Sequence, residues 1–131
     1  MALDVHVVTP DHEVWGGPAE MVIARGTAGE VGILSGHAPL LIRLAIGVLR
    51  IQVEGGTWER VVVDGGFLHV TTEEGATRVD VLATQAELVA DVDRAAAQAR
   101  VRALGERAGD ADDPSLKAEL ASAMIRAELG E

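Results

Sequence analysis

The first two thirds of the chain consist of short apolar runs, rich in valine and isoleucine, that are separated by glycine-containing turns. Runs of this kind, bounded by turn signals about every 8 to 12 residues, are typical of a β-sandwich or a β-barrel. Each sheet in such a fold has one apolar face, which must be covered by another layer. The predicted strands are residues 3–8, 20–25, 47–53, 58–63, 67–71 and 77–83.

The sequence pattern changes after Ala83. Residues 91–108 are rich in alanine and arginine and contain no run of β-branched side chains, a composition that favours a helix. Asp113 and Pro114 then suit the N-cap and the first position of a second helix, which is predicted to run to about Leu129. The two helices are expected to pack as an antiparallel hairpin. The apolar stripe of the second helix consists of Leu116, Leu120, Ala123, Met124 and Ala127.

The start of the first helix has two candidates. Thr84 and Glu87 have the spacing of a capping box, whereas Asp91 is suited to cap a helix that begins later. We favour the later start.

Together, the strand and helix patterns predict an all-β N-terminal sandwich over residues 1–86, followed by a C-terminal α-helical hairpin over residues 87–131.

The composition excludes several kinds of partner and site. The chain has 131 residues, a formal net charge of -10 and no cysteine. Nucleic acid and anionic lipid both require a surface of lysine and arginine, so neither is expected as a partner. The lack of cysteine excludes disulfides and thiolate metal sites. No apolar run reaches the roughly 18 residues of a membrane span, and residues 1–10 do not have the pattern of an export signal.

The four histidines do not form a metal or catalytic motif. His6, His12, His37 and His69 fall on separate predicted strands and turns, without the spacing of metal ligands. Nucleophilic and acid–base sites need paired groups on converging elements, and the candidates here are dispersed. The glycines of residues 26–36 are not followed by the lysine and hydroxyl residue of a phosphate-binding loop. We therefore expect no metal and no catalysis by this chain alone.

One stretch combines turn residues with exposed polar side chains. Residues 29–41 read GEVGILSGHAPLL, an apolar strand that is broken by glycines and stopped by a proline. Gly36 gives the backbone access to positive φ, and Pro39 pushes the residue before it towards an extended conformation. A turn of this composition is suited to presenting a surface rather than merely joining two strands. Glu30 and His37 are the polar side chains that we expect it to present.

This stretch resembles the signature of the epsilon subunits of F-type ATP synthases. Ser35 departs from that family, which often has proline at this position. The resemblance covers nearly the whole chain, in the family's order and spacing. It continues through GVLRI at 47–51, VDGGFLHV at 63–70, VDVLA at 79–83 and DVDRA at 91–95.

The resemblance implies a non-catalytic central-stalk subunit of a proton-translocating ATP synthase, one that couples c-ring rotation to ATP synthesis. The sandwich would bind the gamma subunit and contact the c-ring, with Glu30 and His37 at this interface. The hairpin would reach the alpha and beta subunits when it extends, and would thereby inhibit ATP hydrolysis. The protein would lie peripherally on the cytoplasmic face of the bacterial plasma membrane, with membrane contact only through the complex.

We expect no cofactor, and the resemblance leaves open a weak regulatory ATP site. Asp91, Arg94 and Ala95 match the motif by which some epsilon subunits bind ATP, and Arg126 would complete the site from the second helix. Guanidinium groups suit phosphate because they donate in bidentate geometry. Ser122 stands where nucleotide-binding relatives tend to carry another arginine. The alternative is that Asp91 and Arg94 form only a surface pair, worth about 0.2 to 0.5 kcal/mol.

Two other functions stay open on the sequence alone. A stand-alone nucleotide sensor would bind ATP as an isolated chain. A purely structural rotor adaptor would keep its hairpin static, so removal of the residues after Ala90 would leave ATP hydrolysis unchanged.

Overall fold

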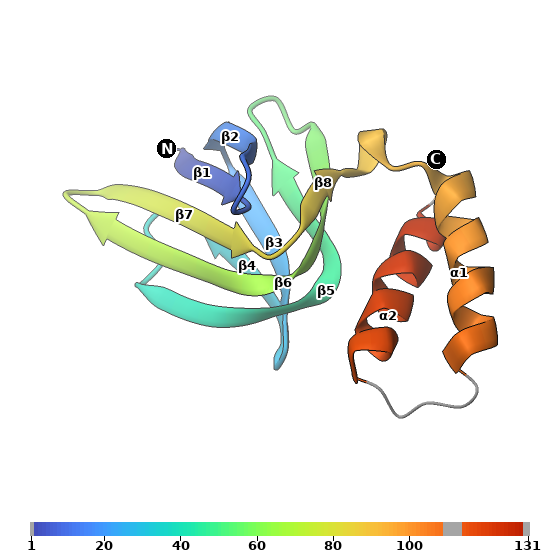
Figure 1. Ribbon diagram of the computed structural model, residues 1–131. Coiled ribbons are helices and arrows are strands. Elements are labelled where there is room, and N and C mark those ends of the chain that lie inside the picture. Colours follow the sequence, from blue (N-terminus) through green and yellow to red (C-terminus); the bar gives the residue numbers. More distant parts are fainter. Residues whose placement is uncertain (1, 109–113, 130–131) are drawn as a thin grey trace. The chain divides into compact units, whose positions relative to one another are not determined.

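The structure is a computed structural model that describes residues 2–108 and 114–129. The chain divides into two compact units, Met1–Leu88 and Val89–Glu131. The described part of the first unit is built of strands and that of the second of helices (Figure 1). The predicted fold class, an N-terminal sandwich followed by a helical hairpin, is confirmed. No helix in the described residues is long and apolar enough to cross a membrane.

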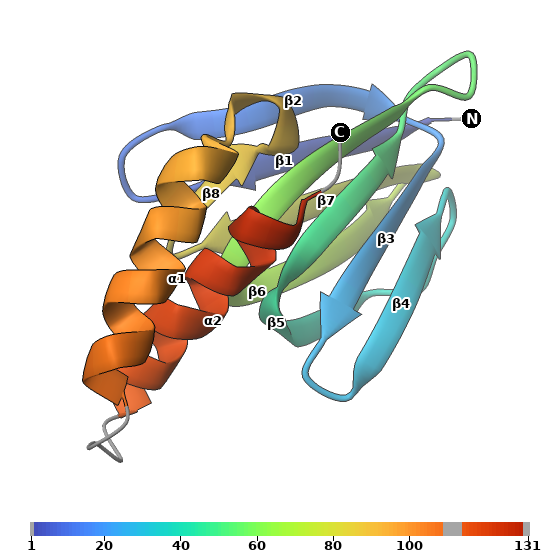
Figure 2. The same cartoon turned by 90° about the vertical axis from the view of Figure 1, so that its right-hand side faces the viewer.

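The strands of the first unit follow the order β2-β1-β7-β6-β5-β3-β4, and β8 pairs with β6 (Figure 2). The β1–β7 pair is parallel, and the other pairs are antiparallel. The bounds are β1 Leu3–Val8, β2 Glu13–Ala19, β3 Met21–Gly26, β4 Gly29–Leu34, β5 Leu40–Gln52, β6 Trp58–Glu73, β7 Ala76–Ala83 and β8 Ala86–Leu88.

The longest strands, β5 and β6, contribute to both layers of the sandwich. The second half of β6 pairs with β7, its first half pairs with β8, and β5 runs beside both halves. Our separation of residues 58–63 from residues 67–71 is therefore wrong, because the two segments form one strand. Gly65 and Gly66, with φ of 102° and 117°, bend this strand without ending it. The bend lets one strand pass from one layer to the other.

The core of this unit consists of apolar side chains that alternate along the strands with exposed ones. On β1, for example, Leu3, Val5 and Val7 are buried, whereas Asp4 is exposed. This alternation is the strand period that the sequence showed. The largest fully buried side chains are Leu3, Ile33, Leu49, Ile51, Leu68, Val5, Val7, Val22, Val61, Val62, Val70 and Val79.

The second unit comprises a short 3₁₀ turn, η1 (Val89–Asp91), and the helices α1 (Arg94–Ala108) and α2 (Pro114–Glu128). The later of the two proposed helix starts is correct, but the cap is not Asp91. Asp93 is the N-cap residue, because its carboxylate accepts a 3.0 Å hydrogen bond from the Ala96 amide. Asp91 lies in η1, and the Thr84 hydroxyl donates to the carbonyl oxygen of Asp64 at 3.1 Å, so no capping box forms.

The second helix begins at Pro114 as predicted, and the proposed cap Asp113 lies outside the described residues. The hairpin has a small core of its own, formed by Leu104, Leu116 and Ala123 with Val101 and Leu120 against it. Met124 was predicted to join the apolar stripe, but it is exposed.

Candidate functional site

The turn between β4 and β5 holds His37 in a defined geometry. The His37 amide donates to the carbonyl oxygen of Leu34 at 3.1 Å, and Gly36 has a φ of 86°. The ring Nδ1 lies 2.7 Å from the carbonyl oxygen of Ala38. Because a carbonyl only accepts, Nδ1 carries a proton in this arrangement, and Nε2 is an acceptor in the neutral ring.

Two threonines of the β6–β7 hairpin anchor this turn. The Gly36 amide donates to Oγ1 of Thr77 at 2.8 Å, and the Thr72 hydroxyl donates to the carbonyl oxygen of His37 at 2.9 Å. The two hydroxyl oxygens lie 3.3 Å apart. Neither threonine was recognised from the sequence pattern. Only the β6–β7 register, which places Thr72 opposite Thr77, reveals them as a pair.

Glu30 does not share the turn with His37. It is an exposed residue near the start of β4, whereas His37 follows the end of that strand. The four residue-to-residue steps along the strand from Glu30 to Leu34 span about 13 Å. The Glu30 carboxylate forms an ion pair with the guanidinium of Arg50 on β5. The structure therefore presents the two predicted interface residues at opposite ends of β4.

An exposed apolar patch, which the sequence analysis did not identify, lies on the outer side of β5, β6 and β7. Phe67 on β6 pairs with Leu82 on β7, and His69 on β6 pairs with Leu41 on β5. Because Phe67 and His69 are two residues apart on one strand, their side chains and those of their partners lie on the same face. The Arg43 guanidinium carbon lies 5.9 Å from the centroid of the Phe67 ring. We call Leu41, Phe67 and Leu82, which are 65%, 45% and 54% exposed, the apolar patch.

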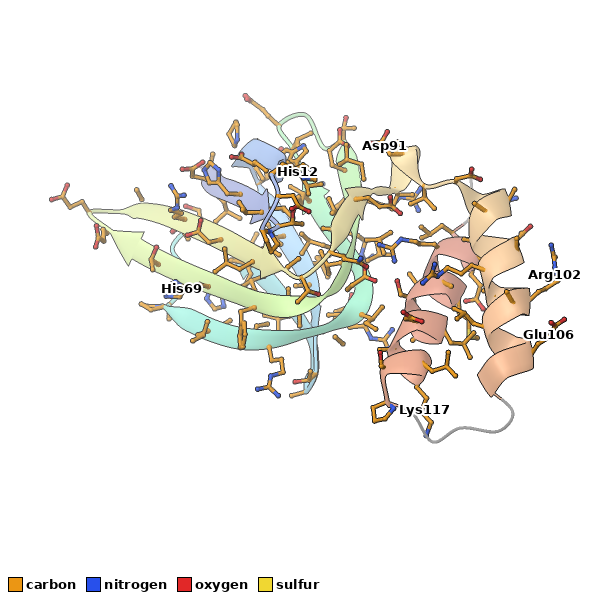
Figure 3. The ribbon with its side chains drawn as sticks, in the orientation of Figure 1. His12, His69, Asp91, Arg102, Glu106 and Lys117 are labelled. Atoms are coloured by element: carbon orange, nitrogen blue, oxygen red, sulfur yellow. The ribbon has the colours of Figure 1, made fainter. Side chains whose placement is uncertain are left out.

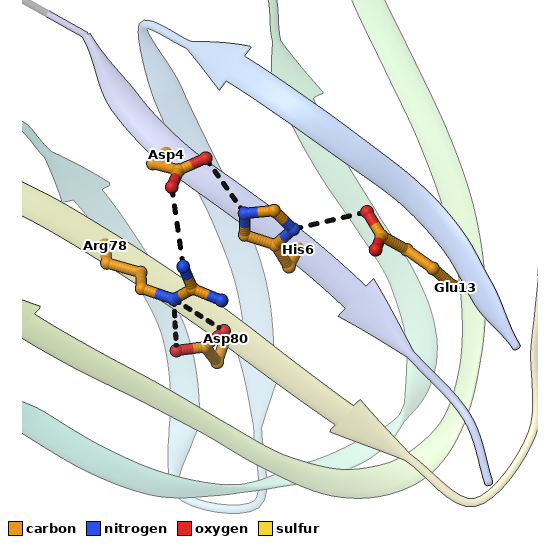
Figure 4. Close-up of polar contacts among 5 residues, drawn as sticks. All are labelled: Asp4, His6, Glu13, Arg78 and Asp80. Carbon is orange, nitrogen blue, oxygen red and sulfur yellow. Dashed lines mark hydrogen bonds and ion pairs between the residues drawn. The ribbon is translucent and has the colours of Figure 1, made fainter.

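A charged network lies on the same outer side, on β7 and on its neighbours β1 and β2 (Figure 4). His6 lies between two carboxylates, with Nε2 2.9 Å from Asp4 and Nδ1 3.2 Å from Glu13. Arg78 donates from Nε to both carboxylate oxygens of Asp80 at 3.0 Å. The hydrogen bond and charge of Asp80, together with the charges of Asp4 and Glu13, raise the pKa of Arg78 above its usual value. The network thus forms an acidic border beside the apolar patch.

The remaining histidines do not converge on a site. His12 and His69 are exposed at different places on the β unit (Figure 3). Among the described residues, no group of three or more His, Asp or Glu side chains is placed to hold a metal ion.

The predicted nucleotide-binding residues make contacts within the hairpin. Arg94 Nη1 donates to the carbonyl oxygen of Leu129 at 3.1 Å, which joins the start of α1 to the end of α2. Arg126 donates to the hydroxyl and carbonyl oxygens of Ser122, at 2.6 and 3.3 Å. Ala95 is exposed on the first turn of α1, and Asp91 precedes that helix in η1 (Figure 3). The two arginines therefore lie at the same end of the hairpin.

Comparison with solved structures supports this fold. The chain superposes on part of the mitochondrial ATP synthase OSCP/F1/c-ring structure of Euglena gracilis with a TM-score of 0.76 at 22% identity, covering 95% of this chain and 76% of that chain. It also superposes on part of the central stalk/c-ring structure of the Tetrahymena thermophila mitochondrial ATP synthase, with a TM-score of 0.56 at 18% identity, covering 96% and 92%.

Sequence comparison gives the family. Residues 2–89 match the family described as the ATP synthase delta/epsilon chain, beta-sandwich domain. The ATP synthase epsilon chain of a Synechococcus strain is 48% identical over 99 residues, which cover 76% of this chain and 69% of that protein. The epsilon chain of Chromohalobacter salexigens is 41% identical over 124 residues, 92% of this chain and 85% of that protein. The chain therefore belongs to the ATP synthase epsilon-chain family.

Proposed function

We propose that this chain is a non-catalytic rotor subunit that couples c-ring rotation to ATP synthesis in a proton-translocating ATP synthase. The observation that carries the proposal is the apolar patch on the outer side of β5, β6 and β7. Three large apolar side chains exposed together on one sheet are typical of a protein-binding surface. The gamma subunit of the central stalk, which the resemblance to epsilon subunits implies as a partner, is our candidate for the protein that would cover them.

The patch has the composition of an interface centre with a polar rim. Phe67 is an aromatic anchor, and Arg43 stacks near its ring. His69, which lies opposite Leu41, and the charged network around Arg78 provide polar groups beside these side chains. Full burial of each apolar side chain would contribute about 1.5 to 3 kcal/mol, so the patch would supply a substantial part of the binding free energy.

Glu30 and His37 are our candidates for contacts on the c-ring and gamma side. Glu30 offers an exposed carboxylate whose partner, Arg50, is also solvent-accessible. His37 offers Nε2 from a turn whose backbone is held by hydrogen bonds. Since these residues lie at opposite ends of β4, they would contact different parts of the rotor.

The hairpin would regulate ATP hydrolysis by extending towards the alpha and beta subunits. Its core is small, so opening exposes few buried side chains. The described residues of α2 carry two cations, Lys117 and Arg126, and two anions, Glu119 and Glu128. With charges balanced in this way, electrostatic attraction to an acidic partner surface would be weak, and inhibition would be moderate.

A regulatory ATP site would lie at the end of the hairpin that carries Arg94 and Arg126. Both guanidinium groups already donate to the hairpin in this structure. Phosphate would have to compete with these hydrogen bonds, so binding would be weak.

We propose that the subunit lies peripherally at the cytoplasmic face of the bacterial membrane, with membrane contact only through the complex.

A purely structural rotor adaptor is the second candidate, and one observation favours it. Arg94 closes the open end of the hairpin through Leu129, and Arg100 lies 3.9 Å from Glu119 across the two helices. These contacts would help to keep the hairpin compact. The two candidates differ in whether hydrolysis responds to removal of the hairpin.

Co-expression with the gamma subunit tests the proposed function. The full-length chain should co-elute with gamma in gel filtration. A tagged full-length chain should also retain the gamma–c-ring assembly in a pull-down. A folded chain that stays monomeric beside both would contradict a rotor role.

A further inference from the structure

We propose that Thr72 and Thr77 are positioning residues, whose hydroxyl groups fix the His37 turn before any partner binds. The role of the turn in binding rests on the proposed function, whereas the hydrogen-bonded arrangement itself does not. Both threonines belong to the β6–β7 hairpin, while the turn joins β4 to β5. The contact thus connects segments that are distant in the sequence, Gly36 and Thr77 being 41 residues apart.

The chemistry of the groups fixes the direction of each hydrogen bond. The Gly36 amide can only donate, so Thr77 Oγ1 accepts at 2.8 Å. The His37 carbonyl can only accept, so the Thr72 hydroxyl donates at 2.9 Å. The Thr77 proton is then the one that lies between the two hydroxyls, 3.3 Å apart, with Thr72 as acceptor. The result is a continuous chain of donors that starts at Gly36 and ends at His37.

Burial makes this chain of hydrogen bonds sensitive to a lost hydroxyl. Thr77 is only 2% exposed and is one of the few buried polar side chains among the described residues. Loss of its hydroxyl would leave the Gly36 amide without this acceptor. Loss of the Thr72 hydroxyl would leave both the His37 carbonyl and the Thr77 proton without their partner. Since each hydroxyl accepts and donates, the bonds are expected to strengthen one another.

The turn needs such a support because its own backbone is permissive. Gly36 has a φ of 86°. Glycine adopts positive and negative φ about equally readily, so this residue alone does not fix the turn in one conformation. The threonine contacts hold the peptide groups on both sides of the Gly36–His37 linkage. The hydrogen bond from the His37 Nδ1 to the carbonyl oxygen of Ala38 then orients the imidazole ring. The position of Nε2 is therefore fixed before a partner binds. Pre-organisation lowers the entropy lost when a partner binds.

Valine and serine variants separate the hydroxyl from the shape of the side chain. Thr72→Val and Thr77→Val remove the hydroxyl, whereas Thr72→Ser and Thr77→Ser keep it. Thr71→Val is the matched control, because Thr71 is adjacent, is half-buried like Thr72 and makes no hydrogen bond through its hydroxyl in the described structure. The full chain is measured in each case, and the melting temperature identifies variants that remain folded.

Amide hydrogen exchange of the isolated chain tests the hydrogen-bonded arrangement. We expect the exchange rate of the Gly36 amide to rise about tenfold in Thr77→Val, and the rates of the turn to rise about three- to tenfold in Thr72→Val. The serine variants and Thr71→Val should exchange like the unaltered chain. Unchanged exchange in both folded valine variants would overturn the proposal.

Binding to the gamma–c-ring assembly tests the positioning role. We expect both valine variants to bind about three- to tenfold more weakly, with the serine variants restoring the affinity. Faster exchange with unchanged affinity would overturn the positioning role. If the unaltered chain fails to bind, the proposed function fails, while the exchange experiment still decides whether the threonines fix the turn.

Discussion

A β-carbon placed on Gly66 would lie 2.1 Å from the carbonyl oxygen of Leu82 on the neighbouring strand. This close approach occurs where β6 bends between the two layers of the sandwich. At the preceding residue, Gly65, the nearest atom to such a carbon would be 3.7 Å away. Both glycines have positive φ, so an added side chain would strain the backbone at either position. Only at Gly66 would it also clash with the neighbouring strand.

Gly66→Ala is therefore expected to destabilise the sandwich by about 3 kcal/mol or more, because backbone strain and a steric clash combine. Gly65→Ala should cost only about 1 to 2 kcal/mol, from the backbone strain alone. Urea denaturation of both variants measures the difference. Equal stability of the two would show that the strand can bend without this close approach.

Asp93→Ala is expected to destabilise the start of α1 by about 1 kcal/mol, because it removes the acceptor of the Ala96 amide. Asp91→Ala, two residues earlier in η1, should change the helix by no more than about 0.5 kcal/mol. Helical circular dichroism during thermal unfolding compares the two. A larger loss for Asp91→Ala would contradict our assignment of the cap.

Glu30→Gln is expected to lower the number of protons pumped per ATP hydrolysed while changing stability by less than about 1 kcal/mol, since its pair with Arg50 is exposed. Glu54→Gln, another exposed glutamate, is the control. Proton pumping and hydrolysis are measured together in the reconstituted complex. Normal coupling in the Glu30 variant would remove this residue from the rotor interface.

Truncation after Ala90 is expected to raise ATP hydrolysis by the whole complex only a few fold. The balanced charge of α2 gives little electrostatic attraction to the alpha and beta subunits, so the hairpin should inhibit only moderately. The effect should depend weakly on ATP concentration. Hydrolysis is compared for the full-length and truncated chains at low and high ATP. A rise beyond about 30-fold, which corresponds to about 2 kcal/mol, would show that the hairpin is a strong inhibitor.

Local patterns explain why so much of the fold could be predicted. The alternation of buried and exposed residues on β1 and the change of period after Ala83 are visible without any knowledge of distant contacts. The Gly65–Gly66 pair misled us for the same reason. Two adjacent glycines indicate a turn locally, and only the pairing with β5 on both sides of them shows that the strand goes on.

The site was less predictable because it depends on contacts between distant segments. Glu30 and His37 were found from their motif, but the bounds of β4 were needed to show that they lie apart. Thr72 and Thr77 had no sequence signal, since their hydroxyl groups act on a turn far from them in the chain. The apolar patch likewise combines residues from three strands, whose register the sequence does not reveal.

The affinity of the apolar patch for gamma tests the account most directly. Phe67→Ala combined with Leu82→Ala removes two exposed side chains, and Trp58→Ala is the control because Trp58 is a 41% exposed aromatic on the same strand. Titration calorimetry with purified gamma measures each affinity. We predict that the double variant binds at least about 30-fold more weakly, with a nearly unchanged melting temperature, and that Trp58→Ala binds normally. Undiminished binding by the folded double variant would contradict the account.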